Sequence, residues 1–245
     1  MNFNASAHPP ASLLGHFASF QSRWGLRRLL AYVWLRRLAW RWLLDGAETA
    51  KRAVDVVGSA CALLVLSPLF ALIAVVIKLQ DRGPIFFAQT RVGRYGREFR
   101  MIKFRSMWPD ADRRLAEVLA QNQHAGGVTF KMRHDPRVTP IGRYLRRFSL
   151  DELPQFYNVL IGDMSLVGPR PPVPREVALY ALSDRRRLAV KPGITCLWQI
   201  SGRADIDFSG QVKLDVNYID NPSLKQDLRI LVKTVPAVIF GAGAY

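Results

Sequence analysis

The chain has 245 residues, of which 49% are hydrophobic, so it is long enough to form one large domain or two small ones around a real core. Its 35 Lys and Arg residues against 19 Asp and Glu residues give a net charge of +16 at pH 7, which indicates an anionic partner such as lipid headgroups, a phosphorylated substrate or nucleic acid. The two cysteines, Cys61 and Cys196, are far apart and fit neither a zinc-binding nor a disulfide pattern, so we expect both to be reduced.

The first 44 residues contain two different segments. Residues 1–20 carry scattered Ser, Ala and Pro and predict a disordered lead, and no signal peptide is expected because the apolar run begins only near residue 53. Residues 21–44 are rich in Trp, Arg and Leu, which is typical of a helix in a membrane interface. Arg28 and Arg36 lie outside the basic arc that the other arginines form on a helical wheel, so packing on the protein's own surface is the alternative.

Residues 56–77 form an apolar run of 22 residues without a charge. A straight helix of this length would reach roughly 33 Å, enough to cross a bilayer. However, bases flank the run on both sides, whereas a spanning helix usually has one strongly basic flank. Ser67-Pro68 also falls near its middle, where proline removes a backbone donor and bends or breaks the helix.

We therefore expect residues 51–80 to form a re-entrant hairpin, helix–break–helix, that enters and leaves the membrane on its cytoplasmic face. Ser67 can satisfy a carbonyl that Pro68 leaves free. Asp55 and Lys78 are expected at the two membrane-surface ends. A single spanning helix and a buried helix of a soluble protein are the alternatives.

The next segment changes to β-rich character. Apolar residues at 85–87 and 99–104 flank a turn at Gly93–Gly96, which predicts a β-hairpin over residues 84–107. This hairpin carries more bases than solubility requires, and we interpret them as facing an anion. They are Arg91, Arg94, Arg97, Arg100, Lys103 and Arg105.

The remaining chain predicts short helices separated by irregular segments. Helices are expected over residues 110–123, 140–147, 149–160 and 224–240. Pro236 is expected to end or bend the last helix, and proline excludes helix or sheet from residues 168–172. Residues 190–199 have short β or irregular character, and Trp198 is expected in the core. No strand–helix alternation supports a doubly wound nucleotide-binding fold, and the sequence has no Gly-rich phosphate loop.

The residues Ser149 to Glu152 carry the strongest chemical signal. Ser149 and Glu152 have the spacing of a capping box at a helix N-terminus, which is the purely structural interpretation. The nearby Arg143, Arg146 and Arg147 favour a functional one, because helix N-termini and arginines bind phosphate.

Adjacent carboxylates among arginines suit the cleavage of a pyrophosphate bond. An ionised carboxylate such as Asp151 can attack phosphorus and form an acyl phosphate. A second carboxylate, Glu152, can help to hold Mg²⁺, which neutralises phosphate oxygens.

Three segments resemble a known family. They are Phe104–Met107, Ser149–Pro172 (SLDELPQFYNVLIGDMSLVGPRPP) and Val190–Arg203 (VKPGITCLWQISGR). With the Ser67-Pro68 break, the sequence is similar to the monotopic bacterial sugar transferases, the polyprenyl-phosphate phosphoglycosyl transferases, from about Lys51 to Val235.

This resemblance implies that a sugar-1-phosphate moves from a UDP-sugar to undecaprenyl phosphate, with UMP as the second product. Asp151 then corresponds to the nucleophile, and Asp151 and Glu152 would hold Mg²⁺. The residues corresponding to the family's substrate-binding positions are Lys103, Arg147, Arg170, Arg203 and Asp215.

The resemblance also implies an α+β protein at the bacterial inner membrane. Residues 1–50 would be the lead and an amphipathic interfacial helix, residues 51–80 the re-entrant hairpin, and residues 81–245 a small α/β catalytic domain facing the cytoplasm. The expected partners are the two substrates and anionic lipids, without nucleic acid; a homodimer is compatible with the family. The product would start exopolysaccharide, capsule or O-antigen synthesis. A non-catalytic basic protein that binds membranes, or a scaffold for polysaccharide assembly, is the alternative.

Overall fold

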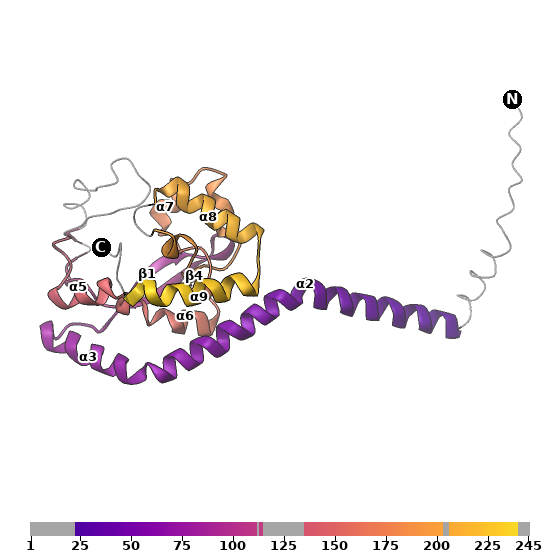
Figure 1. The fold of residues 1–245 in the computed structure, drawn as a ribbon, viewed down its shortest axis with the longest axis horizontal. Coiled ribbons are helices and arrows are strands. Elements are labelled where there is room, and N and C mark those ends of the chain that lie inside the picture. Colours follow the sequence, from indigo (N-terminus) through magenta and orange to yellow (C-terminus); the bar gives the residue numbers. More distant parts are fainter. Residues whose placement is uncertain (1–22, 112, 115–134, 203–205, 240–245) are drawn as a thin grey trace, which may run out of the picture. The chain divides into compact units, whose positions relative to one another are not determined.

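The computed structural model describes residues 23–111, 113–114, 135–202 and 206–239 (Figure 1). The chain divides into two compact units, Met1–Ala50 and Lys51–Tyr245. Helix α2 (Arg23–Val65) begins in the first unit and ends in the second. The lead expected over residues 1–20 lies outside the described residues.

The described part of the first unit is a helix with exposed apolar and basic side chains. Leu30, Trp34 and Leu35 are more than half exposed. The guanidinium of Arg36 lies 5.6 Å from the ring centroid of Tyr32, one helical turn earlier. Residues 23–44 are therefore helical, as the composition of the segment predicts.

The second unit contains short helices and two small sheets, so the predicted α+β class is confirmed. Strands β1 and β2 form an antiparallel hairpin in which Phe86 pairs with Phe104 and Val92 with Glu98, as predicted for this segment. Strands β3 and β4 form a separate parallel pair. Its described elements after α2 are α3 (Ser67–Asp81), β1 (Phe86–Val92), the 3₁₀ turn η1 (Arg94–Gly96), β2 (Glu98–Phe104), α5 (Pro140–Arg147), the 3₁₀ turn η2 (Leu150–Glu152), α6 (Gln155–Ile161), β3 (Ser165–Val167), α7 (Pro174–Ala178), the 3₁₀ turn η3 (Asp184–Leu188), β4 (Gly193–Thr195), the 3₁₀ turn η4 (Trp198–Ile200), α8 (Phe208–Asp220) and α9 (Leu224–Ile239).

The apolar run breaks where the sequence predicts. Helix α2 ends at Val65, α3 begins at Ser67, and the two helices are bent by 58°. Pro68 has no N–H for the Leu64 carbonyl, and the Ser67 hydroxyl donates to that oxygen at 2.8 Å. Within the described residues no single helix is long and apolar enough to cross a membrane, whereas the bent pair Gly46–Val65 and Ser67–Asp81 passes that test together.

The end of α2 is fastened to the domain by buried polar contacts. The Lys51 ammonium donates to the Val167 carbonyl at 3.0 Å and to Asp227 at 2.6 Å. The Asp55 carboxylate accepts from the Ser165 hydroxyl at 3.0 Å and the Leu166 N–H at 2.9 Å. Asp55 is only 4% exposed, because its side chain packs against the start of β3, and its place at a membrane-surface end stays a prediction. The Asp55 carboxylate accepts hydrogen bonds from the first two residues of β3.

The hairpin strand β2 joins two hydrophobic cores. Phe99 and Met101 point into a core shared with α6, β3, α8 and α9, while Phe104 points to the other face. There Phe104 packs with Ile73 and Ile77 of α3 and with Leu145 of α5. Helix α3 therefore packs on the hairpin and on α5 through a common hydrophobic core.

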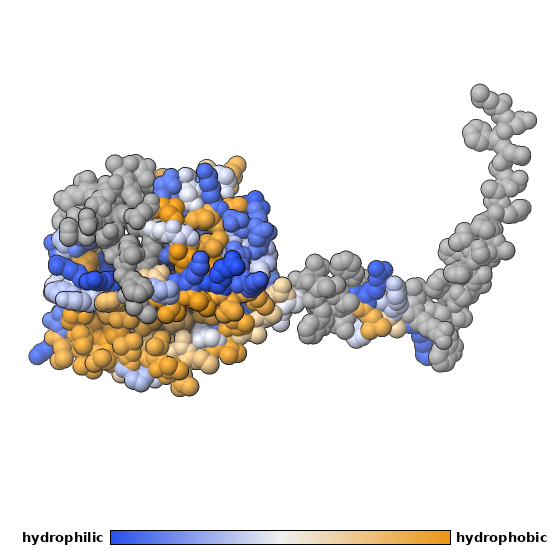
Figure 2. All heavy atoms as spheres, in the orientation of Figure 1, coloured by the Kyte–Doolittle hydropathy of each residue, from blue (hydrophilic) through white to orange (hydrophobic). Residues whose placement is uncertain are grey.

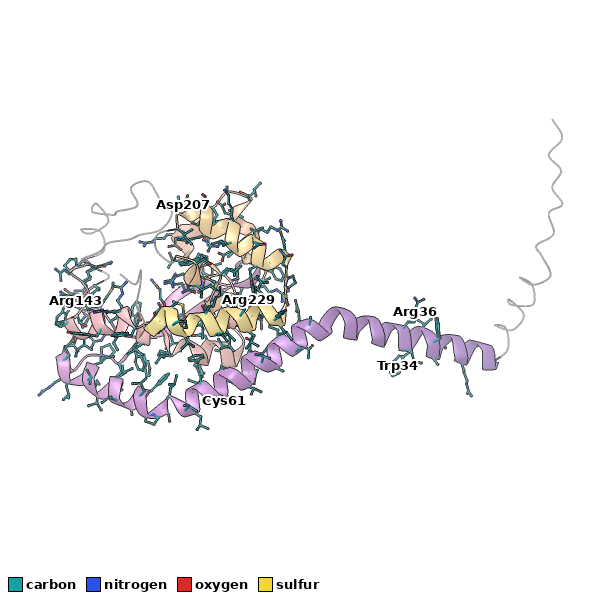
Figure 3. The ribbon with its side chains drawn as sticks, in the orientation of Figure 1. Trp34, Arg36, Cys61, Arg143, Asp207 and Arg229 are labelled. Carbon is teal, nitrogen blue, oxygen red and sulfur yellow. The ribbon has the colours of Figure 1, made fainter. Side chains whose placement is uncertain are left out.

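Apolar side chains gather over the α2–α3 side of the second unit, and hydrophilic ones lie on the other side (Figure 2). Cys61 projects outward from α2 near the bend (Figure 3). The exposed large apolar residues of this face include Val57, Leu64, Val65, Leu72, Val75 and Leu79. A monomeric soluble protein rarely exposes so continuous an apolar surface.

The helix expected over residues 224–240 is confirmed as α9, which contains Pro236 and continues to Ile239, so proline does not end it. One helix prediction needs correction. Of the helix expected over residues 110–123, residues 110, 111, 113 and 114 form a turn and the others lie outside the described residues.

Candidate active site

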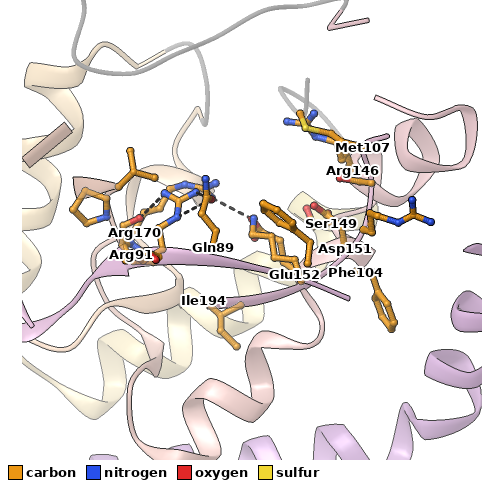
Figure 4. A pocket seen from close by; sticks show the side chains of 18 of the residues that line it. Gln89, Arg91, Phe104, Met107, Arg146, Ser149, Asp151, Glu152, Arg170 and Ile194 are labelled. Atoms are coloured by element: carbon orange, nitrogen blue, oxygen red, sulfur yellow. Dashed lines mark hydrogen bonds and ion pairs between the residues drawn. The ribbon is translucent and has the colours of Figure 1, made fainter. Parts of the chain in front are cut away.

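A cavity of about 860 Å³ opens in the second unit, and it brings together segments that are distant in the sequence. Its walls come from β1, β2, the turn η2, residues 170–176 and the region around η4, with Thr234 of α9 on one side. Four of the predicted residues, Lys103, Asp151, Glu152 and Arg170, line it together. Figure 4 shows Asp151, Glu152 and Arg170 among the lining side chains.

The two carboxylates are placed by a sharp turn after α5. Ser149 adopts a left-handed conformation with φ of 53°, which ends α5, and η2 carries Asp151 and Glu152 into the cavity. The predicted capping box is absent, because the Ser149 side chain makes no capping hydrogen bond and Glu152 turns to Lys103 instead. The α-helix that follows, α6, begins only at Gln155. A tertiary ion pair has displaced the local capping interaction.

Glu152 is held in its ionised form by two cations. Its Oε1 accepts from Lys103 Nζ at 2.6 Å and from Arg170 Nη1 at 3.4 Å. Burial opposes its ionisation, but Lys103 and Arg170 together outweigh burial and lower the pKa of Glu152 to about 2. Glu152 is therefore a permanent anion that fixes these two cations at the cavity wall.

Asp151 is in the opposite situation. It is buried, and its carboxylate accepts no hydrogen bond from any described residue. Burial raises the pKa of Asp151 and the Glu152 charge raises it further, while Lys103, Arg146 and Arg170 oppose both. A buried carboxylate without a described donor and within reach of several cations is a candidate for the reactive group of the site.

The loop that carries Arg170 is fixed by close backbone packing. A Cβ atom on Gly193 would lie 2.1 Å from the Gly168 nitrogen, so these two backbones can approach only because both residues are glycine. Arg91 Nη1 donates to the Pro171 carbonyl at 2.9 Å, while Gln89 accepts from Arg91 Nη2 at 2.7 Å. Arg91 thereby ties the hairpin to the Arg170 loop.

Comparison with known proteins identifies the family of the chain. The sequence model of the family described as bacterial sugar transferase matches residues 46–241. The chain belongs to the bacterial sugar transferase family.

Individual members are similar over most of this transferase. The galactosyl transferase CpsE of Streptococcus agalactiae serotype III (strain NEM316) is 50% identical over 196 residues, covering 80% of this chain and 43% of that protein. The exopolysaccharide production protein ExoY of Sinorhizobium fredii is 45% identical over 199 residues, covering 80% and 88%. The undecaprenyl-phosphate galactose phosphotransferase of Salmonella typhimurium is 44% identical over 198 residues, covering 80% and 41%. The chain thus spans less than half of two relatives and most of the third.

Three other predicted site residues of the transferase lie elsewhere. Arg147 is exposed, with its guanidinium 5.6 Å from the Phe148 ring centroid, and it does not line the cavity. Asp215 is buried behind the cavity wall and binds Arg187, which does line it. Arg203 lies outside the described residues.

Sequence reasoning missed the places of Arg91, Arg146 and Arg187 in the transferase. Arg91 was recognised only as one of six basic hairpin residues, of which Arg91, Lys103 and Arg105 line the cavity. Arg146 was one of three arginines near the carboxylates, and only the phase of α5 shows that it faces the cavity. Nothing in the sequence around Arg187 indicated a site residue.

The two carboxylates could hold a magnesium ion only together with groups of a substrate. Among the described residues no group of three or more His, Cys, Asp and Glu side chains could enclose a metal. Mg²⁺ is, however, typically held by one or two carboxylates together with substrate phosphates and water. Asp151, which no described donor occupies, and the adjacent Glu152 supply such a pair.

Proposed function

We propose that this transferase moves a sugar-1-phosphate from a UDP-sugar to undecaprenyl phosphate, through a covalent intermediate on Asp151, and so begins the synthesis of an exopolysaccharide, capsule or O-antigen. The observation that carries the proposal is the Asp151 carboxylate, buried without a donor among the described residues and within electrostatic reach of Lys103, Arg146 and Arg170. The name of the Salmonella relative, an undecaprenyl-phosphate galactose phosphotransferase, supports undecaprenyl phosphate as the acceptor.

In the first step, an Asp151 oxygen attacks the phosphorus that bears the sugar. The bond from this phosphorus to the bridging oxygen breaks, and UMP leaves with the bonding electrons. Lys103 and Arg170, fixed by Glu152, lie where they can bind the pyrophosphate oxygens as charge moves to the leaving group. The ionised form of Asp151 is required, and the cations around it favour that form.

In the second step, an oxygen of undecaprenyl phosphate attacks the same phosphorus. The acyl phosphate bond breaks, so Asp151 returns as a carboxylate and undecaprenyl-diphospho-sugar is released. Both nucleophiles are anions, so neither step needs a general base. Bound Mg²⁺, held by Asp151, Glu152 and substrate phosphate, would neutralise the phosphate oxygens.

The lipid acceptor requires the cavity to lie near a membrane. We propose that the bent pair of α2 and α3 is a re-entrant hairpin in the cytoplasmic face of the inner membrane, with Ser67 and Pro68 at its deepest point. The exposed apolar side chains on this pair support that placement. Arg143, Arg147 and Arg229 are exposed bases suited to anionic headgroups.

The test is UMP release by the purified chain in nanodiscs, with undecaprenyl phosphate, Mg²⁺ and a panel of UDP-hexoses. We expect release with one or a few donors, and its loss in Asp151→Asn and in excess EDTA. The intermediate predicts that wild-type protein gains the mass of a sugar phosphate when the acceptor is left out. Normal turnover in Asp151→Asn would exclude the covalent mechanism, and normal turnover in EDTA would exclude the metal.

A further inference from the structure

One end of the cavity differs in chemistry from the reaction centre. We call it the polar lobe and define it by Tyr180, Arg187, Trp198, Gln199 and Gln211, which all line the cavity. They come from the segment after α7, from η3, from η4 and from α8. At the reaction centre the cations outnumber the carboxylates, whereas the polar lobe is built from aromatic rings, amides and a single guanidinium.

The charge of that guanidinium is already balanced. Arg187 Nη2 binds the Asp215 carboxylate, and Arg187 Nη1 donates to the Tyr180 hydroxyl at 3.1 Å. Arg187 and Asp215 are 5% and 1% exposed, so this pair is shielded from water. The guanidinium also lies over the rings of Tyr180 and Phe208, at 5.8 and 5.6 Å from their centroids. Such a lobe suits a neutral planar group better than a phosphate.

Two donors on residues of the polar lobe lack a partner. The Nε of Arg187 and the Nε1 of Trp198 are buried and make no hydrogen bond within the described part of the chain. Buried N–H groups are nearly always paired in native proteins, so two unpaired ones within the polar lobe call for a ligand that brings acceptors. Uracil is planar and carries two carbonyl acceptors.

The polar lobe lies on the Arg170 side of the reaction centre. In Figure 4, Arg91 and Arg170 lie on one side of Glu152, and Asp151 and Arg146 lie on the other. Cys196 is within electrostatic reach of Arg170 and Arg187, and its thiol donates to Gln199 at 3.2 Å. Arg170 is thus the residue that reaches Glu152 on one side and Cys196, beside the polar lobe, on the other. A donor with its sugar-bearing phosphorus at Asp151 and its pyrophosphate on the cations directs its nucleoside into the polar lobe.

We propose that the polar lobe binds the uracil nucleoside of the donor, that Arg187 and Trp198 contact it, and that Asp215 is a positioning residue that orients Arg187. This inference rests on the proposed function for the direction of the donor. It also changes the role expected for Asp215, which would act through Arg187 without touching the substrate.

The decisive variant replaces the buried pair as a unit. Arg187→Met alone would leave Asp215 as an unpaired buried charge and could prevent folding, whereas Arg187→Met with Asp215→Leu removes both charges at similar volume, which buried ion pairs often tolerate. The matched control is Arg186→Gln with Asp220→Asn, because Arg186 and Asp220 form an exposed ion pair between the same two elements, η3 and α8. Thermal unfolding of each full-length variant in nanodiscs establishes that it is folded.

The readout is binding of UMP and of inorganic pyrophosphate by calorimetry, which does not require turnover. We expect the buried-pair variant to bind UMP at least about tenfold more weakly, the loss expected for a charged hydrogen bond, and to bind pyrophosphate as the wild type does. The control should match the wild type for both ligands. Trp198→Phe, which keeps an aromatic ring and removes the N–H, should weaken UMP several-fold. In turnover assays the donor KM should rise while kcat changes little.

Four results would overturn the proposal: no UMP binding by the wild type, unchanged UMP affinity in the folded buried-pair variant, an equal loss of pyrophosphate affinity, or an altered preference among UDP-sugars with unchanged UMP affinity. The last would place the sugar in the polar lobe. Because UMP binding is measured without transfer, a failure of the proposed reaction remains distinguishable from a failure of this assignment.

Discussion

Asp151 and Glu152 are neighbours in the chain, yet their surroundings act on them in opposite directions. Glu152 is stabilised as an anion by Lys103 and Arg170, whereas burial makes the charge of Asp151 costly in the folded state. The proposed nucleophile is therefore the carboxylate that the fold stabilises less, which is expected where function opposes stability.

This contrast predicts that Asp151→Asn inactivates the protein but stabilises it. A carboxyl group whose pKa is raised by folding contributes stability at low pH, and this contribution is lost as pH rises through the folded-state pKa. The asparagine variant lacks this loss, so the margin by which its melting temperature exceeds that of the wild type should grow as pH rises above about 4, the ordinary pKa of an aspartate. A rise of roughly 2–4 °C would correspond to about 1 kcal/mol. Thermal unfolding in EDTA, where no metal favours the carboxylate, measures the difference; a lower melting temperature at pH 8 would contradict it.

The structure also separates Arg146 from its neighbour Arg147. Arg146 lines the cavity and acts on Asp151, while Arg147 is exposed beside Phe148. We expect Arg146→Ala to lower kcat/KM by roughly 10²–10³, the loss typical for one donor to developing charge. Arg147→Ala should stay within about threefold in detergent. Steady-state UMP release by both variants tests this, and equal losses would contradict the assignment.

Helix α5 carries Arg146, and a glycine sets its distance from the hairpin. A Cβ atom on Gly142 would lie 1.9 Å from the Ser106 carbonyl oxygen, which is backbone and cannot rotate away. Gly142→Ala should therefore displace α5, at a cost of about 1–3 kcal/mol, and reduce turnover. Gly46→Ala is the matched control: its Cβ would meet nothing within 4 Å, so the substitution should be neutral or stabilising. The melting temperatures of the two variants and the wild type test this prediction. An unchanged melting temperature for Gly142→Ala would show that α5 can move at no cost in stability.

Patterns of neighbouring residues predicted some elements of this fold correctly and failed for others. The β-hairpin follows from the glycine turn, and the break at Leu66 follows from Ser67-Pro68, because each depends on neighbours in sequence. The expected capping box failed because Glu152 meets Lys103, 49 residues earlier, and no local pattern reports such a contact. The position of Arg187 depends on Asp215, which lies 28 residues later in the chain. No local sequence pattern could predict this contact either.

The site as a set was therefore better predicted than its geometry. The resemblance named Lys103, Asp151, Glu152 and Arg170, and the fold brings these four to one cavity. It did not show that Asp215 stands behind Arg187, because the phase of α8 and the packing of η3 are decided by tertiary contacts. Motifs report residue types and spacing, while the distance between motifs is fixed only by folding.

The net charge of +16 and the apolar face of α2 and α3 lead to different kinds of membrane binding. A peripheral basic protein is held by Coulomb attraction, which salt screens; the Debye length falls to about 3 Å at 1 M. A protein that inserts apolar side chains is held by burial, which salt does not weaken.

We therefore expect membranes containing this protein to retain it in 1 M NaCl and to release it in mild detergent. Replacing Val57, Leu64 and Leu72 together by Gln, on the exposed face, should make the retained fraction salt-sensitive. Sedimentation of washed membranes followed by immunodetection measures this, and release of the unmodified protein by salt alone would favour the non-catalytic basic binder over a membrane-inserted transferase.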